Sequence, residues 1–309
     1  MYVYCIFILA SSARIIAEPI PQSHHPVNAF SAGMGLTGVA ISNNPVTIFW
    51  NASGLNRMEQ LGLDFTVAAP NIESPGTWSF LMANASSNQD TRFGLGMTRR
   101  HAKNEHGTFK SFDLILPLSH GFKAGRIPFG FSLKFISESI DEGDWKYGMS
   151  VDIGAMWLYG SGLKFGLSYM NIGGSDLEAF QNELWLGTYW SNAISPLSFS
   201  SQIRGERLLD SDYISQNFGV GVNYRLPDYP FDRNRKIGSF EIRGGLKKAE
   251  SKTWYTFGFD FIQAGSDTHI GYAVVIDAET WSGRSHYLTY GYSYAAGKRP
   301  KSVGGTPFS

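Results

Sequence analysis

The sequence has little cysteine, little charge and no long apolar segment beyond its first residues. Its single cysteine is Cys5, which we expect to leave with an N-terminal leader, so the mature chain would offer neither a disulfide nor a zinc-thiolate site. Charged residues make up 17% of the 309 residues, against about 25% in ordinary soluble proteins. The 26 basic and 26 acidic residues balance, so the net charge gives no argument for binding nucleic acid. No later apolar run reaches the roughly 18 residues that a transmembrane helix needs.

The chain is rich in aromatic residues, at 15%, and in glycine, with 35 residues. Its first residues are apolar from Val3 to Ala10 and are followed by small residues, as in a secretory signal peptide. We therefore expect residues 1–17 to be a signal peptide, although no Lys or Arg precedes the apolar run.

From residue 58 onward, apolar side chains alternate with Gly, Ser, Thr or single charges. In residues 129–135, for example, Phe and Leu alternate with Gly, Ser and Lys. This period of two predicts strands with one apolar face. Strong segments are 61–67, 93–98, 129–135, 149–157, 163–169, 218–224, 255–261 and 288–294, and weaker ones are 77–85, 109–118, 184–190, 197–204, 240–247 and 269–276. Together they predict an all-β antiparallel barrel of about fourteen strands.

The polar face decides between a soluble and a membrane barrel. A strand facing water usually carries Lys, Glu and other long polar chains, whereas here the polar face is mostly Gly, Ser and Thr. Small residues suit a crowded lumen, and apolar residues suit a surface in contact with lipid. Aromatic residues at strand ends suit the two interfacial girdles of a transmembrane barrel: Trp78, Trp145, Trp157, Tyr159, Trp190, Trp254 and Tyr287.

The segment from Asn28 to Leu55 precedes the strands and is apolar, but it is too rich in Gly and Asn for a good helix. We interpret residues 18–57 as a plug inside the barrel formed by residues 58–309. Gly33, Gly35 and Gly38 spell G-x-G-x-x-G, but no buried strand precedes them and a turn signal follows, so we reject dinucleotide binding.

The run SAGMGLTGVAISNNP followed by IFWNASGL, within Ser31 to Leu55, resembles the N-terminal signature of the FadL-type long-chain fatty-acid transporter family. The block from Asp152 through Gly173 resembles a strand pair of its PorV-like branch. Ala52 stands where the family box has proline. We expect the turn there to be kept by Asn51 and Gly54, which both tolerate left-handed backbone.

The resemblance implies a bacterial outer-membrane barrel, with a periplasmic N-terminus, that takes up long-chain fatty acids or similar hydrophobic molecules and releases them sideways into the membrane lipid. The plug residues Gly33, Gly35, Asn51 and Gly54 match the motif. Apolar plug residues are candidates for substrate contact, with packing against the wall as the alternative: Phe30, Met34, Leu36, Ile48, Phe49, Trp50 and Leu55. Pro117 cannot donate to a strand ladder and predicts a local distortion of the wall.

Other functions have weaker signals. Asp152 and Asp260 are more simply explained as lumen charges paired with Lys164 or Arg243 than as an acid–base pair, and His286 beside Ser285 lacks an organised catalytic set. We therefore predict no enzyme, no cofactor and no metal site. The alternative to transport is a PorV-like, non-conducting scaffold or shuttle whose partners would be secretion-system proteins.

Overall fold

The structure, a computed structural model, describes residues 28–42, 44–58, 61–70, 77–83, 90–104, 107–121, 127–140, 143–160, 162–173, 182–192, 195–206, 216–226, 229–232, 235–249, 252–263, 268–279 and 284–294. The expected signal peptide and residues 18–27 of the expected plug lie outside these ranges. Helices come first: α1 (Ala29–Gly33), α2 (Thr47–Trp50) and the 3-10 helix η4 (Ala52–Arg57). None of the described helices has the length and apolar character to cross a membrane.

The strands are β1 (Leu61–Pro70), β2 (Thr77–Ala83), β3 (Thr91–Asn104), β4 (Gly107–His120), β5 (Phe129–Ile140), β6 (Lys146–Tyr159), β7 (Leu163–Ile172), β8 (Glu183–Ser191), β9 (Leu197–Glu206), β10 (Gln216–Arg225), β11 (Tyr229–Asp232), β12 (Arg235–Ala249), β13 (Lys252–Gln263), β14 (Thr268–Asp277) and β15 (Arg284–Tyr294).

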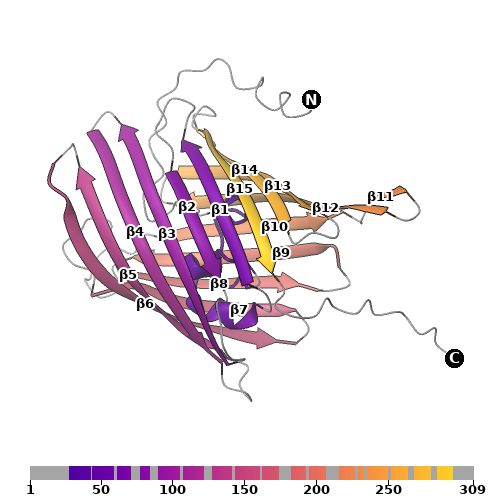
Figure 1. The fold of residues 1–309 in the computed structure, drawn as a ribbon, viewed down its shortest axis with the longest axis horizontal. Coiled ribbons are helices and arrows are strands. Elements are labelled where there is room, and N and C mark those ends of the chain that lie inside the picture. The colour runs from indigo at the N-terminus through magenta and orange to yellow at the C-terminus, as the bar shows by residue number, and fades with distance from the viewer. Residues whose placement is uncertain are drawn as a thin grey trace.

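These strands form one antiparallel sheet that closes on itself (Figure 1). Sequence neighbours pair from β1 to β10 and from β12 to β15, while the β1–β15 and β10–β12 pairs complete the circle. The closed ring has 14 strands, as predicted, because β11 pairs with β12 alone. Closure leaves no unpaired edge, which a barrel in hydrocarbon requires because lipid offers no partner to backbone groups.

The unusually long connection after β10 is explained by β11. This strand and the first residues of β12 form a small hairpin with register shifts, and β12 then joins β10 at the Glu241–Arg225 pair. Gly238 lies at the junction with a φ of 152°, and a Cβ there would overlap the carbonyl of Ile262. Only glycine fits such a position without strain.

The side chains alternate as the sequence pattern predicts, with the apolar residues outside. On β13, Phe257 is 56% exposed and Phe259 is 44% exposed, whereas Thr256 and Asp260 are buried. On the other strands large apolar residues also face outward, and the inward residues are mainly Ser, Thr, Gly or charged. Trp185, Trp254 and Tyr287 are exceptions, because they are buried inside the barrel; Trp254 and Tyr287 are therefore not part of the expected aromatic girdles. A soluble protein would show the reverse, so this outer face is suited to hydrocarbon.

Residues 28–58 lie inside the ring, where strands enclose the indigo helical turns in Figure 1. α1 contacts β12 to β15, α2 contacts β3 and β4, and η4 contacts β3 to β6. The inward-facing glycines make this packing possible, since a Cβ at Gly130, Gly166 or Gly221 would overlap the backbone of the enclosed segment. The predicted placement of the leading segment in the lumen is therefore confirmed, and we call residues 28–58 the plug.

Candidate functional site

Asn51 is the polar centre of the plug motif. Its Oδ1 accepts hydrogen bonds from the N and Oγ of Ser53, at 3.2 and 2.6 Å, and so caps η4. Its Nδ2 donates to the carbonyls of Val39, Ala155 and Leu167 at 2.9, 3.2 and 3.3 Å, which ties the plug to β6 and β7. The backbone of Asn51 is extended, with a φ of −165°. The expectation of a left-handed Asn51 is wrong, because the residue acts through its side chain.

The glycines of the motif allow close approach. A Cβ on Gly54 would overlap the Thr47 hydroxyl, and Gly54 is not left-handed, contrary to expectation. Gly35 is left-handed, with a φ of 69°, and a Cβ there would overlap the carbonyl of Val220 on β10. A Cβ on Gly33 would lie 3.3 Å from the backbone of β13. These positions fix how closely the plug backbone approaches the wall.

Polar side chains of the wall hydrogen-bond the plug backbone beyond α1. Thr256 on β13 accepts from the N–H of Gly35 at 3.0 Å. Gln202 on β9 accepts from the N–H of Gly38 at 2.9 Å and donates to the carbonyl of Leu36 at 3.1 Å. Sequence reasoning did not single out Thr256 or Gln202, although the period of two places both on the inner face.

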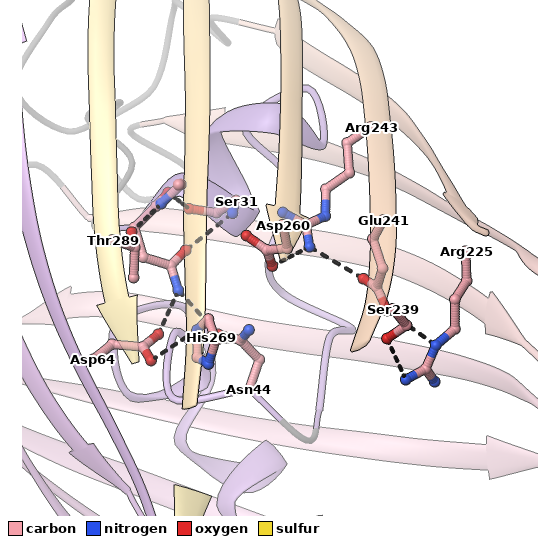
Figure 2. Close-up of polar contacts among 12 residues, drawn as sticks. Ser31, Asn44, Asp64, Arg225, Ser239, Glu241, Arg243, Asp260, His269 and Thr289 are labelled. Atoms are coloured by element: carbon pink, nitrogen blue, oxygen red, sulfur yellow. Dashed lines mark hydrogen bonds and ion pairs between the residues drawn. The ribbon is translucent and has the colours of Figure 1, made fainter. Parts of the chain in front are cut away.

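Asn28 anchors the start of the plug, and its partners Ser31, Asn44 and Asp64 are labelled in Figure 2. Its Nδ2 donates to Asp64 on β1 at 2.9 Å and to Asn44 at 3.0 Å, while its Oδ1 accepts from the N–H of Ser31 and caps α1. The other carboxylate oxygen of Asp64 lies 3.4 Å from Nε2 of His269 on β14. This network joins two parts of the plug to two wall strands. The alternation of residues 61–67 places Asp64 on the inner face, but its partners could not be predicted from the sequence.

Arg243 on β12 forms a second network beside α1 (Figure 2). Its buried guanidinium pairs with Asp260 and, at 3.1 Å, with Glu241. The same guanidinium lies over the ring of Phe30, 4.3 Å from its centroid, which is cation–π geometry. The predicted pairing of Asp260 with Arg243 is confirmed, so this carboxylate is not a free acid or base. Phe30 contacts a cation here in addition to apolar neighbours.

Other lumen charges among the described residues also have polar partners. Asp152 forms an ion pair with Lys134 at 2.7 Å, and not with Lys164 as expected. The cross-strand partner of Asp152 is Ser132 on β5, and Lys134 is the next inward-facing residue of β5. Lys164 instead donates to the hydroxyl of Ser42 in the plug at 2.6 Å. Further inward ion pairs are Arg100–Asp113 and Arg204–Glu183.

The predicted substrate-contacting residues fall into different apolar groups. Ile48, Phe49, Trp50 and Leu55 pack together, with Phe30 at their margin, and we call this group the α2 cluster. Trp50 meets Trp185 of β8 edge to face, with centroids 5.1 Å apart. The other members are Val39, Ile41, Val46, Met58, Leu81, Ala83, Ile115 and Met170. Leu36 belongs to a second cluster with Trp254 and Tyr287, and Met34 is buried with its backbone against Gly221.

The wall beside α2 contains an interruption. Pro117 on β4 keeps its pairing with Ser132 on β5, and that ladder is continuous. On the other side, the β3–β4 ladder runs from Thr91 to Phe93 and resumes at Gly96, so Gly94 and Leu95 have no assigned partner there. A Cβ on Gly94 would lie 2.9 Å from the Pro117 ring and 3.1 Å from Ile48. A plug side chain thus packs directly behind the gap.

No catalytic arrangement emerges from the described residues. His286 forms a hydrogen bond with the hydroxyl of Tyr272 at 2.6 Å, and both side chains lie on the outer face. Ser285 is on the opposite, inner face of β15, the face that also carries the buried Tyr287. Within the described ranges no three His, Cys, Asp or Glu residues are grouped to hold a metal.

Comparison with solved structures finds the same fold in several barrels. The chain is similar to the CymD monoaromatic hydrocarbon channel (TM-score 0.63, 12% identity, 87% of this chain and 96% of that one). It is similar to a Pseudomonas aeruginosa FadL homologue (TM-score 0.60, 10% identity, 91% and 99%) and to the Ralstonia pickettii toluene transporter TbuX (TM-score 0.57, 15% identity, 87% and 97%). No family model and no curated protein matches the sequence.

The fold and the site therefore define a class: a closed β-barrel with an apolar outer face and an internal plug, built like the FadL-type and toluene channels. At these identities the likeness establishes the fold alone. The resemblance to the PorV-like branch has no counterpart among these structures.

Proposed function

We propose that this protein is a bacterial outer-membrane channel that takes up long-chain fatty acids or similar hydrophobic small molecules. The observation that carries the proposal is the α2 cluster, an apolar and aromatic group inside the barrel that lies directly behind the interrupted β3–β4 ladder. An apolar cargo gains about 0.8 kcal/mol for each methylene that leaves water. Such a cluster therefore captures molecules that a water-filled pore would not hold.

The candidate contacts are Ile48, Phe49, Trp50 and Leu55, with Phe30 at the margin and with Met34 and Leu36 farther along the plug. The proposed exit is lateral, through the wall beside Pro117. Gly94 and Leu95 have no assigned partner on β4, so fewer backbone hydrogen bonds oppose a local opening there. Movement of Ile48 would connect the α2 cluster with this part of the wall.

A disulfide staple tests the exit. Leu95 and Leu116 would face each other if the ladder continued, so the double variant Leu95→Cys/Leu116→Cys would bridge the gap. Met97→Cys/Leu114→Cys provides a matched control in the paired part of the same ladder. We expect the first staple to abolish uptake of a radiolabelled fatty acid by cells, and reduction to restore it. The control staple should leave uptake unchanged.

Equal uptake by the two stapled variants would exclude an exit at this position.

Binding is measured separately with the purified barrel, by mass spectrometry of co-extracted lipids. The variant Phe49→Ala should lose bound lipid, while Trp254→Phe, in the second cluster, should retain it.

A second candidate is a PorV-like, non-conducting scaffold or shuttle for secretion-system proteins. The close contact of the plug backbone with inward glycines on several strands favours it, because a tightly held plug suits a closed barrel. Purification that yields stoichiometric protein partners and no lumen lipid would support this alternative.

The proposal includes a signal peptide at residues 1–17, a plug beginning at residue 18 and a periplasmic N-terminus. Sequencing the N-terminus of the exported protein tests the signal peptide, because cleavage would make the mature chain begin at residue 18. Protease treatment of intact cells tests the orientation, since a periplasmic N-terminal tag would stay protected.

A further inference from the structure

Charge is distributed unequally between the two faces of the barrel wall. The acidic side chains described on the ring strands all face the lumen: Asp64, Asp113, Glu138, Asp152, Glu183, Glu241, Asp260 and Asp277. The Lys and Arg side chains that face outward on those strands are Arg99, Lys110, Lys248 and Arg284. The outer face of the described strands is therefore basic, although the whole chain has no net charge.

These outward cations gather at one end of the barrel. β1, β3, β12 and β14 run toward the same end, and Figure 1 shows the β1 and β3 arrowheads there. Lys248 is the penultimate residue of β12, and Arg284 is the first residue of β15. Arg99 pairs with Trp78, the second residue of β2. Lysine and arginine on a lipid-facing surface are costly at the bilayer centre but tolerated near its interfaces, which assigns this end to an interface.

Arg99, His101 and Lys110 form the densest group, which we call the basic rim patch. His101 and Lys110 are direct cross-strand partners, and Arg99 is diagonal to Lys110, within reach of long side chains. Trp78 and Phe112 are the partners of Arg99 on either side, and their rings lie 6.5 Å apart. Among the described residues, none of the three basic side chains forms an ion pair. Basic residues placed opposite each other repel unless an anion lies between them.

We propose that the basic rim patch binds the phosphate groups of an anionic lipid headgroup in the leaflet around this end of the barrel. Arginine and lysine hold phosphate oxygens through charge-assisted hydrogen bonds. Trp78 and Phe112 provide the amphipathic flank found at membrane interfaces, beside which acyl chains pack. The occupant is a lipid because the patch faces outward on a wall whose adjoining surface is apolar. This inference depends on the barrel spanning a membrane and not on which cargo it carries.

The test is native mass spectrometry of the purified full-length barrel in detergent, titrated with diphosphorylated lipid A or with zwitterionic phosphatidylethanolamine. The wild-type barrel should bind lipid A more tightly than phosphatidylethanolamine. Arg99→Gln/Lys110→Gln should lose about tenfold in lipid A affinity, because two charge-assisted hydrogen-bond donors are removed. Lys248→Gln, an outward cation on the same rim but on β12, is the matched control and should stay within about twofold.

Three results would overturn the proposal. If the double variant binds lipid A as wild type does, the patch is no site, and if Lys248→Gln loses as much affinity, only diffuse surface charge attracts the lipid. Displacement of lipid A by millimolar inorganic phosphate would point to a site for free phosphate instead. Heat-modifiable migration on gels confirms that each variant is folded. Uptake assays do not enter this test, so its outcome is independent of the proposed cargo.

Discussion

The two helical ends of the plug contact the wall by different means. Around α1 small apolar side chains pack against the wall, and polar contacts are added through Asn28 with Asp64, Gly35 with Thr256, and Arg243 over the Phe30 ring. Around α2 the contact is mainly apolar, through the α2 cluster and the β3–β4 wall. Buried hydrogen bonds are directional and costly to leave unmade, whereas apolar packing accepts any apolar neighbour of suitable shape. We infer that α1 fixes the plug and that α2 is the part an apolar cargo displaces.

The largest effect should come from breaking the Arg243 network. The variant Arg243→Met leaves Asp260 and Glu241 without their main partner, and we expect a loss of about 3–5 kcal/mol in the free energy of unfolding. Urea unfolding in detergent, followed by tryptophan fluorescence, measures it. Adding Asp260→Leu should recover much of the loss, because an apolar pair can replace a buried ion pair. A change below about 1 kcal/mol for the single variant would mean that the buried Arg243 network contributes no more to stability than a surface ion pair.

An intermediate effect should come from wall glycines, and it should differ between the two ends. In Gly245→Ala the new Cβ would overlap the backbone of Gly35, which cannot yield, and we expect a loss of about 1–3 kcal/mol. In Gly96→Ala the Cβ would meet Cγ2 of Ile48 at 2.9 Å, a side-chain atom of α2 and not backbone, so a small shift of α2 relieves the overlap and the loss should be smaller.

Gly244 is the matched control, since it faces outward and a Cβ there would have one neighbour, at 3.9 Å. Limited proteolysis of the plug distinguishes displacement of the plug from general destabilisation. Equal losses for Gly245→Ala and Gly96→Ala would remove the distinction between a rigid and an adaptable end.

The smallest expected effect is a gain in stability from a proline in the plug motif. Ala52 is the first residue of η4 and follows the extended Asn51, a pair of positions that suits proline. Ala52→Pro should raise the free energy of unfolding by about 0.4–1 kcal/mol, by restricting the unfolded chain. Ser53→Pro is the control, because it removes the N–H that Asn51 accepts and should destabilise. A loss with Ala52→Pro would show that the η4 backbone differs from that of the proline-containing box.

The sequence alone determined the architecture. The alternation of Phe131 with Ser132 and of Phe257 with Thr256 is local information, and it specifies strands, their two faces and the ring. The small inward residues also indicated an occupied lumen, and the plug motif marked its occupant. Strand bounds were less exact: the segment predicted at 240–247 extends over Arg235–Ala249, because the β11 hairpin carries it beyond the ring.

Only the tertiary structure decided which lumen residues meet. Ala29 donates to Thr289, 260 positions away, and Asp152 pairs with Lys134 and not with Lys164. Strand tilt and stagger set the height at which each inward side chain lies, and a period of two carries no information about height. The backbone of Asn51 was mispredicted for a related reason: its side chain has partners on β6 and β7, which determine its conformation and are brought together only when the barrel closes.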